Sequence, residues 1–332
     1  MTSTPTFSVI IPTYNRSRLV AGAIASVLAQ TYTSFEIIVI DDGSTDTTGE
    51  VVRRFEAEHG KRVRYFWQEN QGKSVALNNA FPHARGEFIA FLDSDDRWLP
   101  EKLEWQFLCI QKFGAECPCF TDAIYVNNPF LQETAFEYAG RKYEETLGCV
   151  SNPKALLLGT RSGIYVQTLV VHRSAIQRVG GFDPKLPIGE DTDYLFRLAL
   201  RTRFCYVKKP LVEIDRTVNR KDGLVELQRD ECLRLEKREY LYHKWLALSS
   251  HLGDGTRKQL LARLAETHSE WGNWHLVHRQ YGKARQAMSK SVATSFTARA
   301  AAKLALTTVA PALARREFVK RESERAKHRV IA

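Results

Sequence analysis

The sequence predicts an α/β fold with a parallel, doubly wound sheet, followed by a region made only of helices. Three observations predict it: short apolar runs alternate with helically spaced segments over the first hundred residues, polar clusters follow three of those runs, and only helical patterns remain from about residue 224. Repeated β-α units imply a parallel sheet, and ligands of such sheets bind beyond the carboxyl ends of the strands.

The first four strands are expected at residues 7–11, 35–40, 63–67 and 88–92, where the apolar runs are typical of buried strands. Helices are expected at residues 18–29, 47–58, 74–81 and 100–113. Thr47 and Glu50 have the spacing of a capping box at the start of the second helix.

The pattern then mixes strands and helices, with strands expected at residues 165–172, 205–207 and 211–214 and helices at 174–179 and 192–201. Three helices should follow at residues 224–248, 256–268 and 271–289. Residues 265–293 resemble one tetratricopeptide-like helix pair, with Gly282 between the helices and Ala284 at a close contact. The alternative is a helical hairpin that pads the α/β domain.

Bulk composition indicates a globular protein of 332 residues, 44% hydrophobic and 26% charged, long enough for a large domain and a smaller appendage. No apolar run approaches the roughly 20 residues of a membrane span, and the N-terminus has no basic segment typical of a signal peptide. The six cysteines form no CxxC pair, which favours reduced thiols in the cytoplasm.

The net charge of +10 is uneven, because residues 301–332 carry eight Lys or Arg against three Glu. A basic tail suggests an anionic partner such as a membrane surface, a phosphorylated carrier or nucleic acid. It has no aromatic interleaving of the kind that single-strand binders use, so we expect no nucleic acid partner. A solvated, frayed end is the alternative.

A strand that ends in Asp93, Ser94, Asp95 and Asp96 is the strongest chemical signal. Clustered carboxylates repel one another unless a cation is present, and oxygen-only ligands suit a hard ion such as Mg²⁺ or Mn²⁺. Such an ion most often serves phosphate chemistry, so the cluster predicts a site for a metal-bound diphosphate. The alternative is a solvated turn in which Asp96 caps the next helix.

Three further polar segments lie at strand or helix ends. Tyr14 and Asn15 follow the first strand, and Asp41 and Asp42 follow the second, where carboxylates could accept hydrogen bonds from a base or a ribose; an Asx turn at Asp42-Gly43 is the alternative. Gly72-Lys73 opens a helix and could hold phosphate, although it does not match a P-loop and could simply cap the helix.

Glu190 and Asp191 open another predicted helix. A carboxylate at a helix N-terminus is stabilised by the helix dipole, so either residue could be a cap. Transfer of a group to a hydroxyl also needs a base that removes the proton, and Asp or Glu can serve.

The chain resembles the inverting, DxD-containing glycosyltransferases of family 2, which have the GT-A fold, over about residues 6–216. Five segments in the family's order carry the resemblance: SVIIPTYNR, VIDDGSTD, NQGKSVALNNA, GEFIAFLDSDDRWLPEKLE and GGFDPKLPIGEDTDYLFRL. It implies a GT-A domain with a Rossmann-like mixed sheet at residues 1–222, with a nucleotide-binding half at 1–115 and an acceptor-side half at 116–222. Residues 223–332 would be an all-α C-terminal extension.

The resemblance also implies roles for individual residues. Asp95 and Asp93, assisted by Asp96, would hold Mn²⁺ or Mg²⁺ on the diphosphate, Asp191 would be the catalytic base, and Glu190 would orient the acceptor or support Asp191. The expected nucleotide-sugar-binding residues are Pro12, Tyr14, Asn15, Asp41, Asp42, Gly72, Lys73, Asn78, Asp93 and Ser94. The reaction would be a single displacement with inversion at the anomeric carbon.

Two departures from the family pattern affect these roles. Leu77 replaces the arginine that many members carry in the helix before the metal motif, and we hypothesise that Lys73 supplies the missing charge. The family's histidine after a YR pair is absent near Arg216, which could still approach the diphosphate. His172 is expected at a strand end near the same crevice, either as a structural residue or as a site residue.

The resemblance implies transfer of a sugar, with UDP as the default nucleotide, to a glycan or lipid-linked hydroxyl in polysaccharide, lipopolysaccharide or glycolipid synthesis. We expect a cytoplasmic enzyme with peripheral contact at the inner face of the membrane through the basic tail. A non-catalytic scaffold or binding protein acting through the helical tail is the alternative. A sugar nucleotidyltransferase would instead need a glycine-rich turn after the first strand, where this chain has Pro12-Thr13-Tyr14-Asn15.

Overall fold

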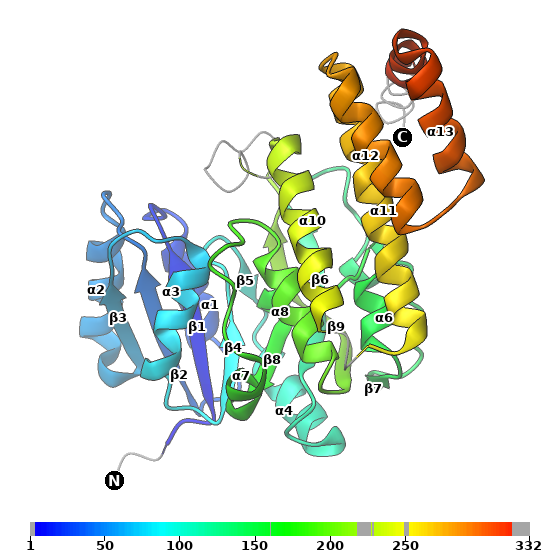
Figure 1. Ribbon diagram of the computed structural model, residues 1–332. Helices are drawn as coiled ribbons and strands as arrows, with labels where there is room; N and C mark the ends of the chain where they lie inside the picture. The colour runs from blue at the N-terminus through cyan, green and yellow to red at the C-terminus, as the bar shows by residue number, and fades with distance from the viewer. Residues whose placement is uncertain (1–3, 160, 218–226, 228, 249–251, 321–332) are drawn as a thin grey trace. The chain divides into compact units, whose positions relative to one another are not determined.

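The chain divides into two compact units, Met1–Asp222 and Gly223–Ala332, in a computed structural model (Figure 1). The structure describes residues 4–159, 161–217, 227, 229–248 and 252–320. Each unit has its own arrangement of elements.

The first unit is built on a nine-stranded sheet, and its N-terminal half is parallel, as the sequence predicts. The spatial order is β3-β2-β1-β4, formed by Val63–Trp67, Phe35–Asp41, Phe7–Thr13 and Phe88–Phe91. All residues of β1, β2 and β4 are buried, which explains why these strands read as continuous apolar runs rather than as alternating patterns.

The other half of the sheet is mixed, so the parallel arrangement indicated by the β-α repeats does not extend across it, and the mixed sheet that the resemblance implied is confirmed. β8 (Leu169–His172) runs antiparallel to β4 and to β6 (Cys119–Val126). β9 (Phe204–Asp215) runs parallel to β6 and antiparallel to both β5 (Arg97–Trp98) and β7 (Leu147–Val150).

Strand β9 replaces the two short strands predicted around residues 205 and 212. Pro210 lies between them, and proline cannot donate a ladder hydrogen bond. The strand instead continues through Pro210, where its register with β6 shifts at Asp122. An irregularity of this kind tolerates proline within a strand.

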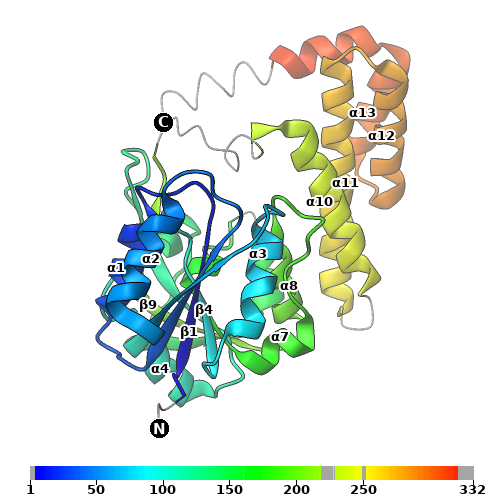
Figure 2. The ribbon, with the colours of Figure 1, turned by 90° about the vertical axis from the view of Figure 1, so that its left-hand side faces the viewer.

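Helices cover both faces of the sheet, and Figure 2 shows α1 (Val20–Leu28) and α2 (Thr48–His59) on one face and α3 (Lys73–Ala80) and α8 (Glu190–Ala199) on the other. The remaining helices of this unit are α4 (Lys102–Phe113), α5 (Ala135–Tyr138), α6 (Pro153–Leu157) and α7 (Arg173–Val179). The predicted capping box of α2 is absent: Thr47 makes no side-chain cap, and the Asp46 carboxylate accepts from the Thr48 N–H at 2.9 Å.

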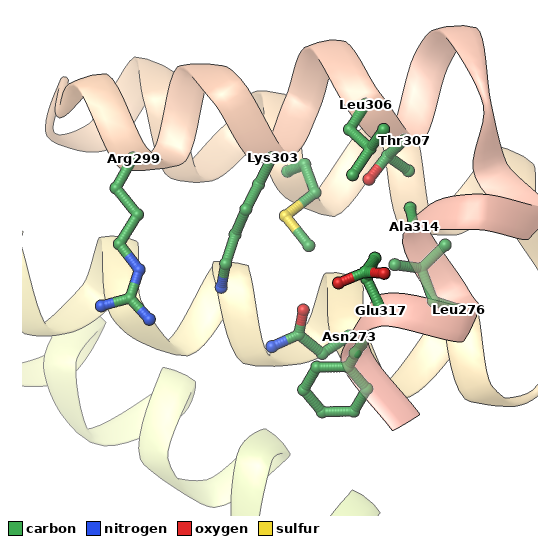
Figure 3. A pocket seen from close by; sticks show the side chains of 10 residues that line it. Asn273, Leu276, Arg299, Lys303, Leu306, Thr307, Ala314 and Glu317 are labelled. Carbon is green, nitrogen blue, oxygen red and sulfur yellow. The ribbon is translucent and has the colours of Figure 1, made fainter. Parts of the chain in front are cut away.

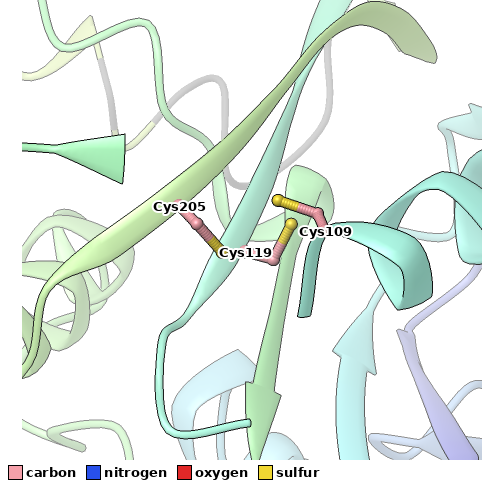
Figure 4. Close-up of side chains that lie close together, drawn as sticks. All are labelled: Cys109, Cys119 and Cys205. Atoms are coloured by element: carbon pink, nitrogen blue, oxygen red, sulfur yellow. The ribbon is translucent and has the colours of Figure 1, made fainter. Parts of the chain in front are cut away.

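Three buried thiols illustrate how the core of the first unit is filled. Cys109 from α4, Cys119 from β6 and Cys205 from β9 lie close together between these elements (Figure 4). All six cysteines are free thiols, as the absence of CxxC pairs favoured, and the three in this group pack as small apolar side chains.

The second unit is helical, with α10 (Glu231–Ala247), α11 (Asp254–Val277), α12 (Tyr281–Thr294) and α13 (Ala298–Val309), and residues 311–320 are also helical. The predicted break near residue 270 is wrong, because α11 is continuous there and the chain turns at Arg279, which has a φ of 59°. Gly282 lies inside α12 rather than between helices, whereas Ala284 is fully buried, as its predicted close contact requires.

Gly272 is the residue that actually allows close packing of α11 on α12, since a Cβ there would lie 2.6 Å from Met288 Cε. A small cavity of about 130 Å³ lies in the same unit, and Leu276, Met288 and Thr307 are among the residues that line it (Figure 3). None of the residues predicted for the functional site lines this cavity. No described helix is long and apolar enough to cross a bilayer.

Candidate active site

The predicted site residues gather at the edge of the sheet where the parallel strands end. β1 ends at Thr13, β2 ends at Asp41, and Asp93 follows β4 by two residues. The N-termini of α3 and α8 bring Lys73 and Glu190 to the same place. Ion pairs join the three segments that carry Lys73, Asp93 and Glu190.

Lys73 lies at the centre of this site. Its Nζ is 2.9 Å from Asp93 Oδ1, 3.4 Å from Glu190 Oε1 and 3.7 Å from Asp191 Oδ2, and its side chain is 15% exposed. Burial alone would lower the pKa of Lys73, but the charges of Asp191, Asp93 and Glu190 outweigh it and hold the pKa well above its usual value. The ammonium group therefore stays charged and balances part of the acidic charge around it.

Asp191 is held in an environment that favours its protonated form. Burial raises the pKa of its carboxyl well above the usual value, Lys73 acts in the opposite direction, and the charges of Glu190 and Asp93 raise it further. Its Oδ1 is buried and has no hydrogen-bond partner among the described residues. A carboxylate solvated this poorly has a high affinity for a proton, which is the property that a general base requires.

Asp93, Asp95 and Asp96 can each direct one carboxylate oxygen to a common point, since these atoms lie within 4.8 Å of one another. Asp96, however, is buried, and both of its oxygens accept hydrogen bonds at 2.8 Å, from the Gln167 side chain and from the Asp215 N–H. Burial, followed by the charges of Asp95 and Asp93, raises its pKa. Asp96 therefore fastens the turn to β9, while Asp93 and Asp95 remain the better metal ligands.

The helix-cap alternative for Asp96 is wrong, because α4 starts at Lys102 and its N-cap position is Glu101. The residue that binds Asp96 was not predicted either. No sequence pattern links Gln167 to a turn some seventy residues earlier, and only the pairing of β8 with β4 brings the two segments together.

Asp41 and Asp42 are buried, and their carboxylates accept hydrogen bonds from other residues of the protein. Asp41 accepts from the Ser44 N–H at 2.9 Å and from the Tyr65 hydroxyl at 2.7 Å. Asp42 accepts from the Gln68 side chain at 2.7 Å and from the N–H groups of Gln71 and Gly72 at 2.9 and 2.8 Å. Asp42 thus positions the loop that presents Lys73, a role that its place after the strand does not reveal.

The other predicted nucleotide-sugar residues differ in exposure. Tyr14 is 46% exposed at this edge, whereas Pro12 is buried within β1 and Ser94 is buried in the acidic turn. Asn15 adopts a φ of 50°, and its side-chain oxygen accepts from the Thr45 N–H at 2.8 Å, which ties the loops after β1 and β2 together. Of these residues, Tyr14 is the one that offers a large exposed surface for a base.

Asn78 pairs with the backbone of Phe182. Its amide nitrogen donates to the Phe182 carbonyl at 2.8 Å, and its amide oxygen accepts from the Phe182 N–H at 2.7 Å. The backbone of Phe182 belongs to the segment that leads into α8. Asn78 therefore holds α3, which carries Lys73, against the chain that positions Glu190 and Asp191.

Leu77, one of the two departures from the family pattern, lies near the site, whereas His172 does not. Leu77 is 1% exposed and one helical turn after Lys73, and Gly72 makes the turn into that helix with a φ of 91°. His172 is not at the crevice: β8 is antiparallel to β4 and pairs His172 with Phe88, the first residue of β4, so His172 lies at the opposite edge. There its ring contacts Ser174 and Glu116.

The mixed sheet and the acidic turn at the carboxyl edge of its parallel strands are those of the GT-A fold. Among solved structures, S. aureus TarS (residues 1–349) in complex with UDP-GlcNAc has a TM-score of 0.70 at 20% identity, covering 96% of this chain and 92% of that one. The mannosyltransferase PcManGT of Pyrobaculum calidifontis, in complex with GDP-Man and Mn²⁺, has a TM-score of 0.56 at 22% identity over 92% and 80% of the two chains.

Curated relatives match part of the chain. An uncharacterized glycosyltransferase of Nostoc sp. is 45% identical over 97 residues, 29% of this chain and 30% of that protein. The E. coli UDP-Glc:alpha-D-GlcNAc-diphosphoundecaprenol beta-1,3-glucosyltransferase WfgD is 42% identical over 106 residues, 32% and 41% of the two chains. The matches span between 14% and 59% of the lengths of such relatives.

Residues 8–166 match the family model described as glycosyl transferase family 2. The resemblance to glycosyltransferase family 2 that the five motifs indicated is therefore confirmed over these residues.

Proposed function

We propose that the chain is an inverting, metal-dependent glycosyltransferase that moves a sugar from a UDP-sugar to a hydroxyl of a glycan or lipid-linked acceptor. The observation that carries this proposal is the meeting of Lys73, Asp93 and Asp191 at the carboxyl edge of the sheet. These residues come from three separate motifs, and together they provide a diphosphate site and a base.

The acidic turn fits a divalent cation in the chemistry of its donors. Asp93 and Asp95 offer carboxylate oxygens only, which suit Mg²⁺ or Mn²⁺, and both are half-buried rather than enclosed. When bound, such an ion offsets the negative charge of the departing nucleoside diphosphate. The Mn²⁺ in the complex of the Pyrobaculum mannosyltransferase supports the same choice here.

The activation of the acceptor hydroxyl is carried out by residues of the protein. Asp191 takes the proton from the acceptor hydroxyl as its oxygen attacks the anomeric carbon, and Glu190 orients the acceptor beside it. Attack from the face opposite the leaving diphosphate inverts the configuration. Lys73 favours the ionised form of Asp191 and so opposes the effect of burial, because its ammonium group lies 3.7 Å from the carboxylate.

Lys73 also provides positive charge where many family members carry an arginine. Leu77 occupies that arginine's place and is buried, whereas Lys73, one helical turn earlier, reaches Asp93 of the metal motif. On donor binding, the diphosphate takes over part of the contact between Lys73 and Asp93. A lysine can serve here because its ammonium group is a compact positive charge that donates hydrogen bonds to phosphate oxygens.

The class of donor and acceptor is proposed from the relatives. TarS binds UDP-GlcNAc, and the name of the E. coli relative gives a UDP-glucose donor and a lipid-linked acceptor. We place the chain in the cytoplasm, peripherally at the inner face of the membrane, in polysaccharide, lipopolysaccharide or glycolipid synthesis. Part of the basic tail supporting the membrane contact, residues 321–332, lies outside the described residues.

A screen of nucleotide sugars by thermal stabilisation tests the proposal. With Mn²⁺ present, we expect UDP-sugars to raise the melting temperature and Asp95→Ala to abolish the metal-dependent part of the shift. A donor-hydrolysis assay with Mn²⁺ then separates an enzyme from a scaffold that only binds. The proposal fails if no nucleotide sugar stabilises the protein, or if the wild-type protein binds a donor and hydrolyses none.

A further inference from the structure

The second unit contains a group of metal-ligand side chains that the proposed transfer reaction does not use. Glu239 and His243 lie four residues apart on α10, so both project from the same face of that helix. His268 on α11 completes the group. One ligand atom from each of the three residues lies within 4.8 Å of the other two.

The distances between these atoms are close to those around a bound ion. His268 Nε2 is 3.2 Å from Glu239 Oε1, and His243 Nε2 is 3.9 Å from the same oxygen. Zinc bonds to histidine nitrogen and carboxylate oxygen are about 2.0–2.2 Å long, so neighbouring ligand atoms lie roughly 3–3.5 Å apart. A rotamer adjustment of His243 alone, which is 59% exposed, would close the remaining gap.

A third helix orients the buried ligand. The His268 side chain is 6% exposed, and its Nδ1 is 3.3 Å from the hydroxyl oxygen of Thr294, the last residue of α12. A hydroxyl can donate or accept, so Thr294 can hold the ring in either tautomer. With Nδ1–H donating to Thr294, the lone pair of Nε2 points toward Glu239 and His243, an arrangement typical of metal-bound histidines.

We propose that Glu239, His243 and His268 bind a divalent transition-metal ion of the zinc class. Two imidazoles and one carboxylate suit Zn²⁺ or Co²⁺, whereas the carboxylates of Asp93 and Asp95 suit a hard ion. The ion would join α10 to α11, and the exposed side of His243 leaves room for water as a further ligand. The site lies wholly in the second unit, so it is independent of the proposed sugar transfer.

A cobalt titration of the full chain tests this proposal, carried out on chelator-treated Asp95→Ala protein so that the acidic turn of the first unit contributes little. We expect visible d–d absorption that saturates with one equivalent of Co²⁺ and is removed by Zn²⁺ but not by excess Mg²⁺. Cys109, Cys119 and Cys205 are the competing soft ligands. Binding there would add an intense near-ultraviolet sulfur-to-cobalt charge-transfer band, and that band would overturn the proposal.

Single substitutions then assign the ligands. His243→Ala and Glu239→Gln should each weaken Co²⁺ binding at least tenfold, while His278→Ala, an exposed histidine on the same unit, should leave it unchanged. His243 is the main test because its exposure lets the variant fold, which far-ultraviolet circular dichroism without metal can verify. Equal affinity in wild-type and His243→Ala protein, or equal loss in His278→Ala, would refute the assignment.

Discussion

At the scale of single residues, the site depends on one buried cation among three carboxylates. Lys73 contacts Asp93, Glu190 and Asp191, so its charge affects both the proposed diphosphate site and the proposed base. The two functions of Lys73 can be separated experimentally, since one changes donor affinity and the other changes the pH dependence of the rate.

Asp191→Asn should lower the turnover rate roughly 10²–10⁴-fold, the range typical of a lost general base. Donor binding should persist, because the amide keeps the shape of the carboxyl and the metal-binding carboxylates are intact. The comparison of single-turnover rates with the UDP-sugar dissociation constant checks this. A variant with near-normal turnover would exclude Asp191 as the base.

Lys73→Ala should weaken donor binding and shift the pH–rate profile. Burial already raises the pKa of Asp191 and Lys73 opposes that rise, so removal of Lys73 should raise the pKa further. The base acts only when ionised, and the acidic limb of the profile should therefore move to higher pH. Measurements of kcat and of donor affinity as functions of pH check both effects. Lys73→Arg is the charge-preserving control. Unchanged donor affinity in the Lys73→Ala variant would contradict the hypothesis that Lys73 replaces the missing arginine.

At the scale of secondary-structure elements, the site depends on how α3 and α8 are held together. Asn78 makes two hydrogen bonds with Phe182, and Ser74 donates to the Leu186 carbonyl at 3.4 Å. These contacts join the helix that carries Lys73 to the segment that leads into Glu190. Sequence reasoning assigned Asn78 to the donor site because of its motif, whereas its position on the inner side of α3 gives it a structural task.

Asn78→Ala should destabilise the protein by roughly 1–3 kcal/mol, because two backbone groups of Phe182 lose their partner. The neighbouring Asn79→Ala is a matched control: Asn79 is exposed and its amide donates only to Gln68, so a change below about 0.5 kcal/mol is expected. Chemical denaturation of the two variants checks the difference. Equal stabilities would mean that the pairing with Phe182 contributes little.

At the scale of the whole molecule, the residues proposed for sugar transfer and those proposed for membrane contact belong to different units. The residues proposed for sugar transfer all precede residue 217, whereas the basic segment belongs to the second unit. Val309 is 85% exposed at the end of α13, and the helix stops before Pro311, since proline cannot continue the hydrogen-bond pattern of a helix. The exposed apolar and basic side chains of this segment support a peripheral membrane role that is separate from catalysis.

Removal of the residues after Thr297 should lower co-sedimentation with anionic vesicles at low salt, because it deletes nine Lys or Arg residues, Arg299 and the eight beyond residue 300. The UDP-sugar affinity should stay within about threefold, since no proposed donor ligand is deleted. Neutral vesicles serve as the control for non-electrostatic binding. If partitioning onto anionic vesicles is the same with and without the segment, the membrane proposal is wrong.

The sequence by itself determined the order of strands and helices and the edge at which the site forms. Apolar runs and turn residues are local signals, and parallel strands end at one edge, so Asp42 and Asp93 could be assigned to one site. Asp191 was assigned to that site through the family resemblance. The tertiary structure decided what each side chain does there. The direction of β8 moved His172 to the opposite edge, and pairings across long stretches of chain gave Asp42, Asn78 and Asp96 protein partners. Strand direction and such contacts depend on residues far apart in the chain, which no local pattern records.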